Sequence, residues 1–235
     1  MSLRIAFDID GVFADLESAY GKVVRTLFSE TPADSEPPDA AEPADDLAAS
    51  DDIEPVHPPG LTLSRWQESE VWREIEETEN FWASLPPLEP GILKRVQDLA
   101  ERHRWEIFFV TQRPDTAGET VQRQTQRWLI EQGFDLPSVV VMSSSRGRLA
   151  EAMRLDYLID DSPLHCADAA SESDTKPVLV VRHDDPQRRR GAREMGIAIV
   201  PTVAAALDLL EQAQEMGDQP GFWKRLTDSF RGSRG

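Results

Sequence analysis

Three features are scarce in this sequence, and each absence excludes a class of protein. There is a single cysteine, Cys166, so no disulfide can form within the chain, which fits a reducing compartment. No stretch approaches the roughly 18 apolar residues of a membrane-spanning helix. Two aspartates interrupt the apolar run at the N-terminus, where a signal peptide would be continuous. We therefore expect a cytoplasmic protein with no membrane span.

Basic residues are missing from one long segment. The 235 residues carry a formal net charge of −18, and no Lys or Arg lies between Arg25 and Arg65. Residues 31–60 are rich in Pro, Asp, Glu and Ala and poor in large apolar side chains, so burial cannot offset the entropy of ordering them. We expect this segment to be disordered. The acidic surface also argues against binding a nucleic-acid polymer, although it leaves a small anionic substrate open.

The rest of the chain alternates between short apolar runs and helical patterns. The runs predict strands at residues 3–9, 105–111, 138–142, 156–159, 177–182 and 197–200. Apolar residues at helical spacing predict helices over 15–29, 64–79, 90–103, 116–132, 146–154, 163–170 and 202–216. Such alternation indicates an α/β fold, in which a parallel sheet is covered by helices on both faces. Functional residues of such folds gather at the carboxyl ends of the strands.

Polar side chains lie at or just after the ends of four of these predicted strands, where a core would need none. They are Asp8 and Asp10 at the end of the first strand, Thr111, Gln112 and Arg113 at the end of the second, Arg146 after the third, and Asp160 and Asp161 at the end of the fourth. Phosphoryl transfer needs a nucleophile in line, a metal and cationic donors around the phosphate oxygens. The set predicts a phosphoryl-transfer site at one rim of the sheet.

Each residue type suits that chemistry. Asp8 and Asp161 offer the hard oxygen ligands that Mg²⁺ prefers, and a carboxylate is a competent nucleophile towards phosphorus. Thr111 offers a hydroxyl group to the phosphate, and a cation completes the charge balance. The four histidines have no metal-ligand spacing, so we expect them on the surface or in ordinary packing.

These motifs resemble those of the haloacid-dehalogenase-like (HAD) superfamily, in its phosphatase branch. The first motif of that family, DxDG[VT], corresponds to residues 8–12, the second to Thr111 in FFVTQRP, and the fourth to Asp160-Asp161 in YLIDDSP. The resemblance covers most of the chain outside the acidic segment and the C-terminal tail. It implies a HAD-like (Rossmann-like) parallel sheet with helices on both faces and a small helical cap inserted after the first strand.

The resemblance also implies a role for each residue. Asp8 would be the nucleophile and a Mg²⁺ ligand. Asp10 would protonate the leaving group, then activate water as a base, while its backbone carbonyl binds the metal. Thr111 would hold a phosphate oxygen. Asp161 would be a direct metal ligand, supported by Asp160.

The third motif departs from the family pattern, because a Lys normally stands there. Arg146 is the best match, and Arg148 is the alternative. Arginine keeps the charge, but it cannot lose its proton and prefers bidentate contacts to oxygen. Gln112 and Arg113 follow Thr111 directly and are candidates for contacting the substrate. A structural ion pair is equally open for Arg113.

The implied domain organisation is a core of residues 1–14 and 89–216, a cap insertion of residues 15–88 and a tail of residues 217–235. The implied function is hydrolysis of a small phosphorylated metabolite, a phosphomonoester, with Mg²⁺ and an aspartyl-phosphate intermediate. The stretch FWASLPPLEPGILKRVQDLA followed by VTQRP is similar to the 5′-nucleotidase and deoxyribonucleotidase group, which implies a nucleotide substrate. The alternative is a non-catalytic protein that keeps the fold and binds a phosphate ligand.

Overall fold

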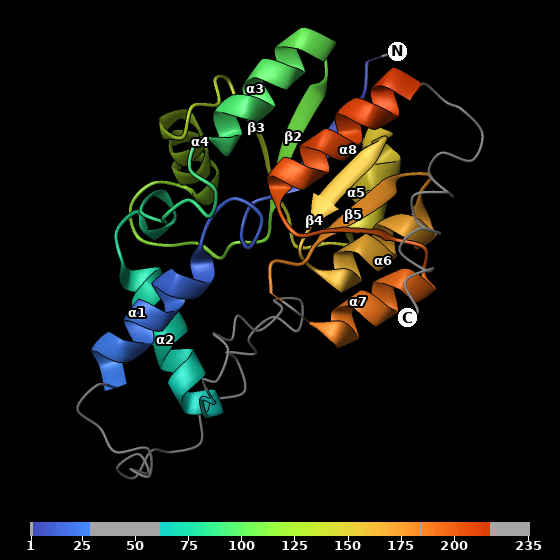
Figure 1. The fold of residues 1–235 in the computed structure, drawn as a ribbon. Coiled ribbons are helices and arrows are strands. Elements are labelled where there is room, and N and C mark those ends of the chain that lie inside the picture. Colours follow the sequence, from blue (N-terminus) through green and yellow to red (C-terminus); the bar gives the residue numbers. More distant parts are fainter. Residues whose placement is uncertain (1, 29–61, 184, 217–235) are drawn as a thin grey trace.

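The computed structural model describes residues 2–28, 62–183 and 185–216 (Figure 1). The disorder expected for residues 31–60 and the tail of residues 217–235 lie outside the described residues. The elements are, in chain order, β1 (Arg4–Asp8), α1 (Leu16–Phe28), α2 (Arg65–Glu77), the 3₁₀ helix η1 (Phe81–Ala83), α3 (Ile92–His103), β2 (Glu106–Thr111), α4 (Val121–Glu131), β3 (Ser138–Val141), α5 (Arg146–Met153), β4 (Tyr157–Asp160), α6 (Pro163–Glu172), β5 (Lys176–Val180), α7 (Pro186–Glu194), β6 (Ala198–Val200) and α8 (Val203–Met216).

The six strands form one sheet in the order β3-β2-β1-β4-β5-β6, and every neighbouring pair is parallel. The predicted α/β fold with a parallel sheet is therefore confirmed. The strand order changes direction beside β1, which pairs with β2 on one side and with β4 on the other. In open α/β sheets the crevice at such a switch point is where ligands bind.

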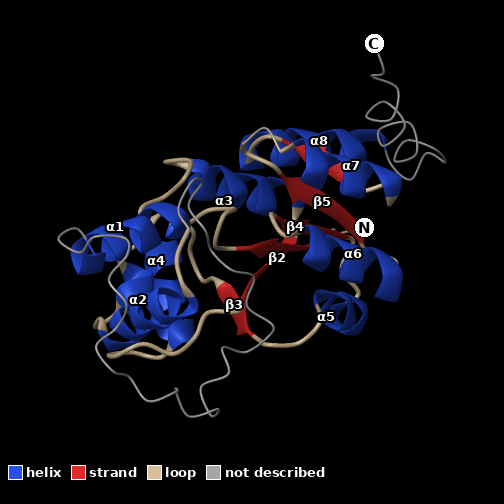
Figure 2. Ribbon diagram, turned by 90° about the horizontal axis from the view of Figure 1, so that it is seen from below, coloured by secondary structure: helices blue, strands red, loops and turns tan. Residues whose placement is uncertain are grey.

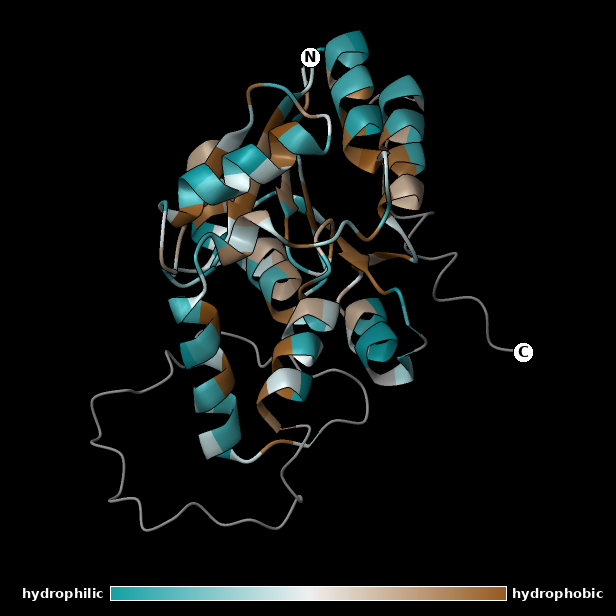
Figure 3. Ribbon diagram, turned by 90° about the vertical axis from the view of Figure 1, so that its left-hand side faces the viewer, coloured by the Kyte–Doolittle hydropathy of each residue, from teal (hydrophilic) through white to brown (hydrophobic). Residues whose placement is uncertain are grey.

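Side chains of β1 alternate between two apolar layers, one on each face of the sheet. Ile5 and Phe7 belong to the layer that includes buried residues of α3, α4 and α8. Ala6 belongs to the opposite layer, with residues of α5 and α6. Figure 2 shows α3 and α8 on one side of the strands and α5 and α6 on the other, and Figure 3 shows hydrophilic residues on the outer surfaces of the helices. Burial on both faces explains why the strands are predominantly apolar.

Helices α1 and α2 pack on each other and extend away from the sheet (Figure 1). Val71 and Ile75 of α2 are fully buried, and the rings of Tyr20 and Trp72 meet edge to face with centroids 5.6 Å apart. Ser64 begins α2 with a capping box, which satisfies two N–H groups that the helix itself leaves without partners. Both helices belong to residues 15–88, the segment predicted to be a cap insertion, and that division into core and cap stays a prediction.

All six predicted strands are present, with ends shifted by one or two residues. Helix α4 begins at Val121 instead of residue 116, because the Thr120 side chain accepts from Arg123 N–H and sets the start. Helix α7 was not among the helices predicted from apolar spacing, although the basic run of residues 188–190 was interpreted as the start of a solvated helix. In the described part of the chain, no helix is long and apolar enough to cross a membrane.

Candidate active site

Two carboxylates lie side by side at the carboxyl ends of β1 and β4. The parallel register pairs Phe7 with Ile159, so the next residues, Asp8 and Asp160, are also neighbours. Both continue the alternation of their strands and face the layer of α5 and α6. Asp160 is fully buried and Asp8 is 7% exposed. Burying two ionised carboxylates so close together is costly unless a positive charge lies nearby.

Arg146 supplies such a charge from the first residue of α5. Its side chain is 1% exposed, its Nη2 lies 3.0 Å from Asp8 Oδ1, and its Nε lies 3.7 Å from Asp160 Oδ2. Arg148, the alternative on the same helix, is exposed. Within the described residues, Nε and Nη1 of Arg146 are buried without a hydrogen-bond partner. Leaving a buried donor without a partner costs about 1–3 kcal/mol, so the site is suited to an anion with acceptor oxygens.

Asp8 has a raised pKa in its buried site. Burial is the largest cause of the rise from 3.8 to about 7, the charge of Asp160 adds to it, and the charge of Arg146 opposes it. The charge of Arg146 therefore does not offset the effects of burial and of the neighbouring carboxylate on Asp8. A bound divalent cation would favour the ionised form of Asp8 and lower its pKa.

His165 joins this group from the first turn of α6. Its Nδ1 lies 3.1 and 3.2 Å from the two carboxylate oxygens of Asp160, and ligand atoms of Asp8, Asp160 and His165 lie within 4.8 Å of one another. Burial by itself lowers the pKa of His165, but the hydrogen bond and charge of Asp160 outweigh it and raise that pKa. The sequence analysis expected this histidine on the surface or in ordinary packing. Its position just after the fourth strand was the one feature of the sequence that could have indicated a place near the site.

Asp161, the predicted metal ligand, lies outside that group of ligand atoms. It follows the last residue of β4, so its side chain leaves the strand in a different direction from that of Asp160. A Cβ at Gly11 would overlap the Asp161 carboxylate, and Gly11 has a φ of +74°. The two acidic residues therefore have different neighbours: Asp160 lies beside Asp8, and Asp161 lies against the loop that follows β1. The metal role of Asp161 stays a prediction.

Asp10 is held by Arg113. Arg113 Nε donates to Asp10 Oδ2 at 2.8 Å, and Nη2 donates to Oδ1 at 2.7 Å. The Arg113 side chain is 1% exposed, and that of Asp10 is 21% exposed. Thr111 is buried at the end of β2, and Gln112, which lies between Thr111 and Arg113 in the sequence, is half-buried. The structure thus brings the second motif next to the first, with Arg113 directed at Asp10.

The loop that carries Asp10 is braced by backbone and side-chain contacts. Gly11 N–H donates to Ala14 O at 3.0 Å. Arg182, which follows β5, donates to Gly11 O at 3.1 Å and to Val12 O at 2.5 Å. Its third nitrogen, Nη1, lies 2.7 Å from Glu89 Oε1. These contacts keep the turn after β1 in place beside the carboxylates.

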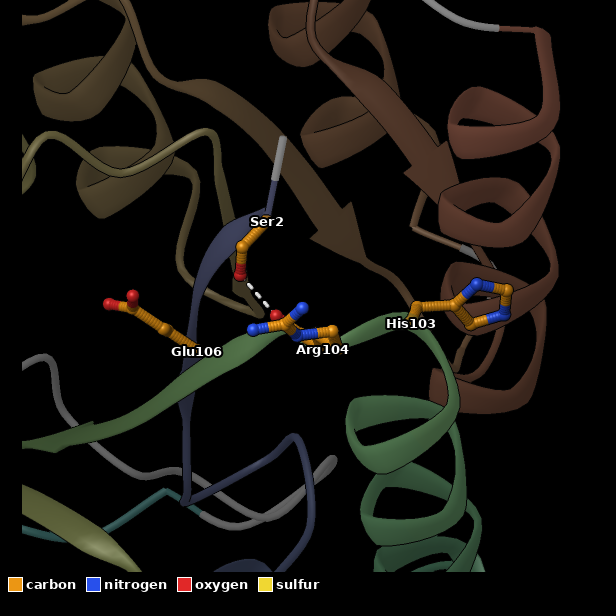
Figure 4. A pocket seen from close by; sticks show the side chains of 4 residues that line it. All are labelled: Ser2, His103, Arg104 and Glu106. Carbon is orange, nitrogen blue, oxygen red and sulfur yellow. Dashed lines mark hydrogen bonds between the residues drawn. The ribbon is translucent and has the colours of Figure 1, made fainter.

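A separate pocket of about 560 Å³ lies at the other end of the sheet (Figure 4). It is lined by Ser2, His103, Arg104 and Glu106, and the Ser2 hydroxyl donates to Arg104 O. Ser2 precedes β1 and Glu106 begins β2, so the pocket is at the amino ends of the strands. It has no part in the cluster around Asp8.

Comparison with known proteins is informative at the level of structure. No family model matches the chain, and no curated protein matches its sequence. The fold is similar to that of a HAD family hydrolase from Deinococcus radiodurans R1, a crystal structure with bound phosphate and sodium. The two structures align with a TM-score of 0.54 and 16% sequence identity, and the alignment covers 91% of this chain and 96% of that chain. A putative beta-phosphoglucomutase from Thermotoga maritima has a TM-score of 0.52 and 18% identity over 89% of this chain and 99% of that one. These structures do not support the 5′-nucleotidase group in particular, and what the chain shares with them is the HAD-like fold.

Proposed function

We propose that the protein is a magnesium-dependent phosphomonoester hydrolase that forms a phosphoryl intermediate on Asp8. One observation carries the proposal. Arg146 is buried beside Asp8 at the switch point of the sheet, and two of its nitrogens have no hydrogen-bond partner among the described residues. A phosphoryl group in line with Asp8 would supply oxygens to those donors. The fold is shared with a HAD family hydrolase whose crystal structure contains bound phosphate, which supports the same proposal.

The residues around Asp8 fit Mg²⁺. The proposed ligands are the carboxylates of Asp8 and Asp161 and the backbone carbonyl of Asp10, all hard oxygen donors. Asp160 adds negative charge beside them, and the pKa of Asp8 is raised by burial first and by the charge of Asp160 second. When bound, Mg²⁺ would neutralise phosphate oxygens and the charge that develops on them during transfer.

The proposed reaction has two steps, and Asp8 and Asp10 act in both. In the first, a carboxylate oxygen of Asp8 attacks phosphorus, the bond from phosphorus to the ester oxygen breaks, and Asp10 gives its proton to that oxygen. In the second, water attacks the phosphorus of the aspartyl-phosphate and loses a proton to Asp10. Inorganic phosphate leaves, and the Asp8 carboxylate is restored.

Substrate contacts are assigned by position. Thr111 and Arg146 flank Asp8 and would hold the phosphate oxygens. Gln112 and Arg113 were expected to reach the rest of the substrate, a role considered further for Arg113 below. We propose a small phosphorylated metabolite as the substrate class, with a nucleotide as one candidate.

The second candidate function is a non-catalytic protein that binds a phosphate ligand. The buried donors of Arg146 would serve such a protein equally well, since they attract phosphate whether or not Asp8 reacts. A trapped phosphoryl group on Asp8 separates the two functions.

The experiment combines turnover with trapping. The purified chain is incubated with 4-nitrophenyl phosphate and with a panel of sugar, nucleotide and other alkyl phosphates, in Mg²⁺ or in chelator. We expect phosphate release in Mg²⁺ alone. Mass spectrometry of acid-quenched enzyme should find one phosphoryl group on the peptide that contains Asp8. Tight phosphate binding without turnover or a trapped intermediate would favour the binding protein.

A further inference from the structure

Arg113 was expected either to touch the substrate or to form a structural ion pair, and its contacts indicate a third role. We infer that Arg113 is a positioning residue for Asp10, which it aims at the reacting oxygen without touching the substrate. The inference rests on the proposed function, in which Asp10 handles protons. It concerns three residues outside the proposed machinery of Asp8, namely Arg113, Thr125 and Trp82, which we call the Asp10 clamp.

All three nitrogens of the guanidinium are engaged. Nε and Nη2 form the bidentate pair with Asp10, and Nη1 donates to Thr125 Oγ1 at 2.9 Å. Arg113 Cζ lies over the Trp82 ring, 4.8 Å from its centroid. All three Arg113 nitrogens already have partners, whereas two buried nitrogens of Arg146 have none among the described residues, so Arg113 is less suited than Arg146 to meet a substrate. Instead, the planar guanidinium group of Arg113 forms two parallel hydrogen bonds with the planar carboxylate of Asp10, and this fixes the rotation of the Asp10 side chain.

The other members of the clamp are themselves held in place. Trp82 N–H donates to Gln124 Oε1 at 3.0 Å, and Trp82 Nε1 donates to Pro114 O at 2.9 Å. Trp82 belongs to η1, on the segment that leads from α2 back to the sheet, and Thr125 belongs to α4. The orientation of Asp10 therefore depends on α4 and on the segment that connects the inserted helices to the core.

The consequence depends on the leaving group. An alkyl oxygen is a poor leaving group unless Asp10 protonates it, whereas 4-nitrophenolate departs as an anion. A well-placed general acid contributes roughly 10²–10⁴-fold. We expect Arg113→Met to lower kcat/KM about 10²-fold for glycerol 2-phosphate and less than about 10-fold for 4-nitrophenyl phosphate. The loss should fall on kcat with KM nearly unchanged, since the first irreversible step is affected and binding is not.

Two further variants separate positioning from binding and from folding. Arg113→Lys should recover part of the alkyl phosphate activity, because one ammonium group can hold one oxygen of Asp10 but cannot form the bidentate pair. When Asp10→Asn is already present, adding Arg113→Met should cause no further loss of kcat/KM for glycerol 2-phosphate. Arg95→Met is the matched control. It breaks a surface ion pair between α3 and α8 and should leave both substrates unaffected.

Several outcomes would overturn the inference. They are equal losses with both phosphates, a raised KM, or losses that multiply when Asp10→Asn and Arg113→Met are combined. If the wild-type chain hydrolyses no phosphate, the proposed function fails, and crystal structures then decide the positioning role by themselves. Asp10 should occupy one rotamer in the wild type and more than one in Arg113→Met. An unchanged Asp10 in the variant would refute the role of Arg113 independently of activity.

Discussion

At the scale of single residues, Asp8 is the point on which the proposed chemistry depends. We expect Asp8→Asn to lower phosphatase kcat by about 10⁶-fold, the order seen when a covalent nucleophile is removed. The amide is a poor nucleophile and carries no charge for a metal. Turnover of 4-nitrophenyl phosphate measures the loss, and circular dichroism shows that the fold survives. A variant that keeps several per cent of wild-type turnover would contradict covalent catalysis by Asp8.

Arg146 offers the second test at this scale. Arg146→Ala should reduce kcat by roughly 10²-fold or more, because one preorganised donor to the phosphate is lost in a site that excludes water. Arg146→Lys should keep a good part of the activity, since it restores a point charge.

Arg148→Ala, on the exposed side of the same helix, is the matched control and should change kcat little. The opposite result, with Arg148→Ala crippling and Arg146→Ala neutral, would mean that the cation has been assigned to the wrong residue.

The sequence gives a clear signal for residues that belong to a motif and a weak one for residues recruited from elsewhere. Asp8, Thr111 and Arg146 follow apolar runs, so their place at the strand ends can be predicted. His165 has no partner at metal-ligand spacing, and it contacts Asp160 only because α6 begins directly after β4. Which carboxylate of the pair Asp160-Asp161 lies beside Asp8 depends on where β4 ends, a boundary that sequence patterns locate within one or two residues at best.

At the scale of elements, the position of Arg146 depends on how closely α5 packs on α6. A Cβ at Gly147 would overlap Asp168 O and the side chain of Glu172. We expect Gly147→Ala to lower stability by about 1–2 kcal/mol, since overpacking costs about 1–3 kcal/mol and the better helix propensity of Ala returns up to about 1 kcal/mol. It should also lower kcat, because α5 must shift. Thermal unfolding and steady-state kinetics measure the two effects.

Gly191 in α7 provides the control for that substitution, because a Cβ there meets nothing within 4 Å. Gly191→Ala should be neutral or stabilising by up to about 1 kcal/mol. If both alanine variants behave alike, close packing of α5 on α6 is not what requires glycine at position 147.

Helix α7 shows why some elements escape sequence patterns. Its sequence, PQRRRGARE, is almost entirely polar, so it lacks the regularly spaced apolar residues from which a helix can be predicted. Ala192 is fully buried and packs in the small layer with Cys166 and Leu179. The helix is held by its position between β5 and β6 and by that small contact, and neither can be seen in a local window of sequence.

At the scale of the whole molecule, the raised pKa of Asp8 links stability to pH and to metal. Its pKa is about 7 in the folded metal-free protein against an ordinary 3.8, so between these values the folded state binds more protons than the unfolded state. The contribution of Asp8 to stability is therefore fully present below pH 3.8 and is lost as pH rises through about 7. In chelator, the stability of Asp8→Asn relative to wild type should increase with pH across this window.

Mg²⁺ should reverse that loss. Since metal binding requires the ionised carboxylate, Mg²⁺ should raise the wild-type Tm more at pH 8 than at pH 5 and should barely raise that of Asp8→Asn. Thermal unfolding with and without chelator measures both effects. Equal stabilisation by Mg²⁺ at the two pH values, or an unimpaired response in Asp8→Asn, would argue against a metal site at Asp8.

The sequence by itself determined the alternation of strands and helices, the parallel sheet, and the rim on which the polar residues gather. It could do so because apolar periodicity and strand-end polarity are local properties of the chain. Only the tertiary structure decided that Asp160 and His165 lie beside Asp8. It also decided that Arg146 faces the carboxylates while Arg148 does not, and that Arg113 forms an ion pair with Asp10. The contacts of Arg113 with Asp10 and of Arg146 with Asp8 join residues 103 and 138 positions apart. Their geometry follows from strand register and helix packing, which no local pattern specifies.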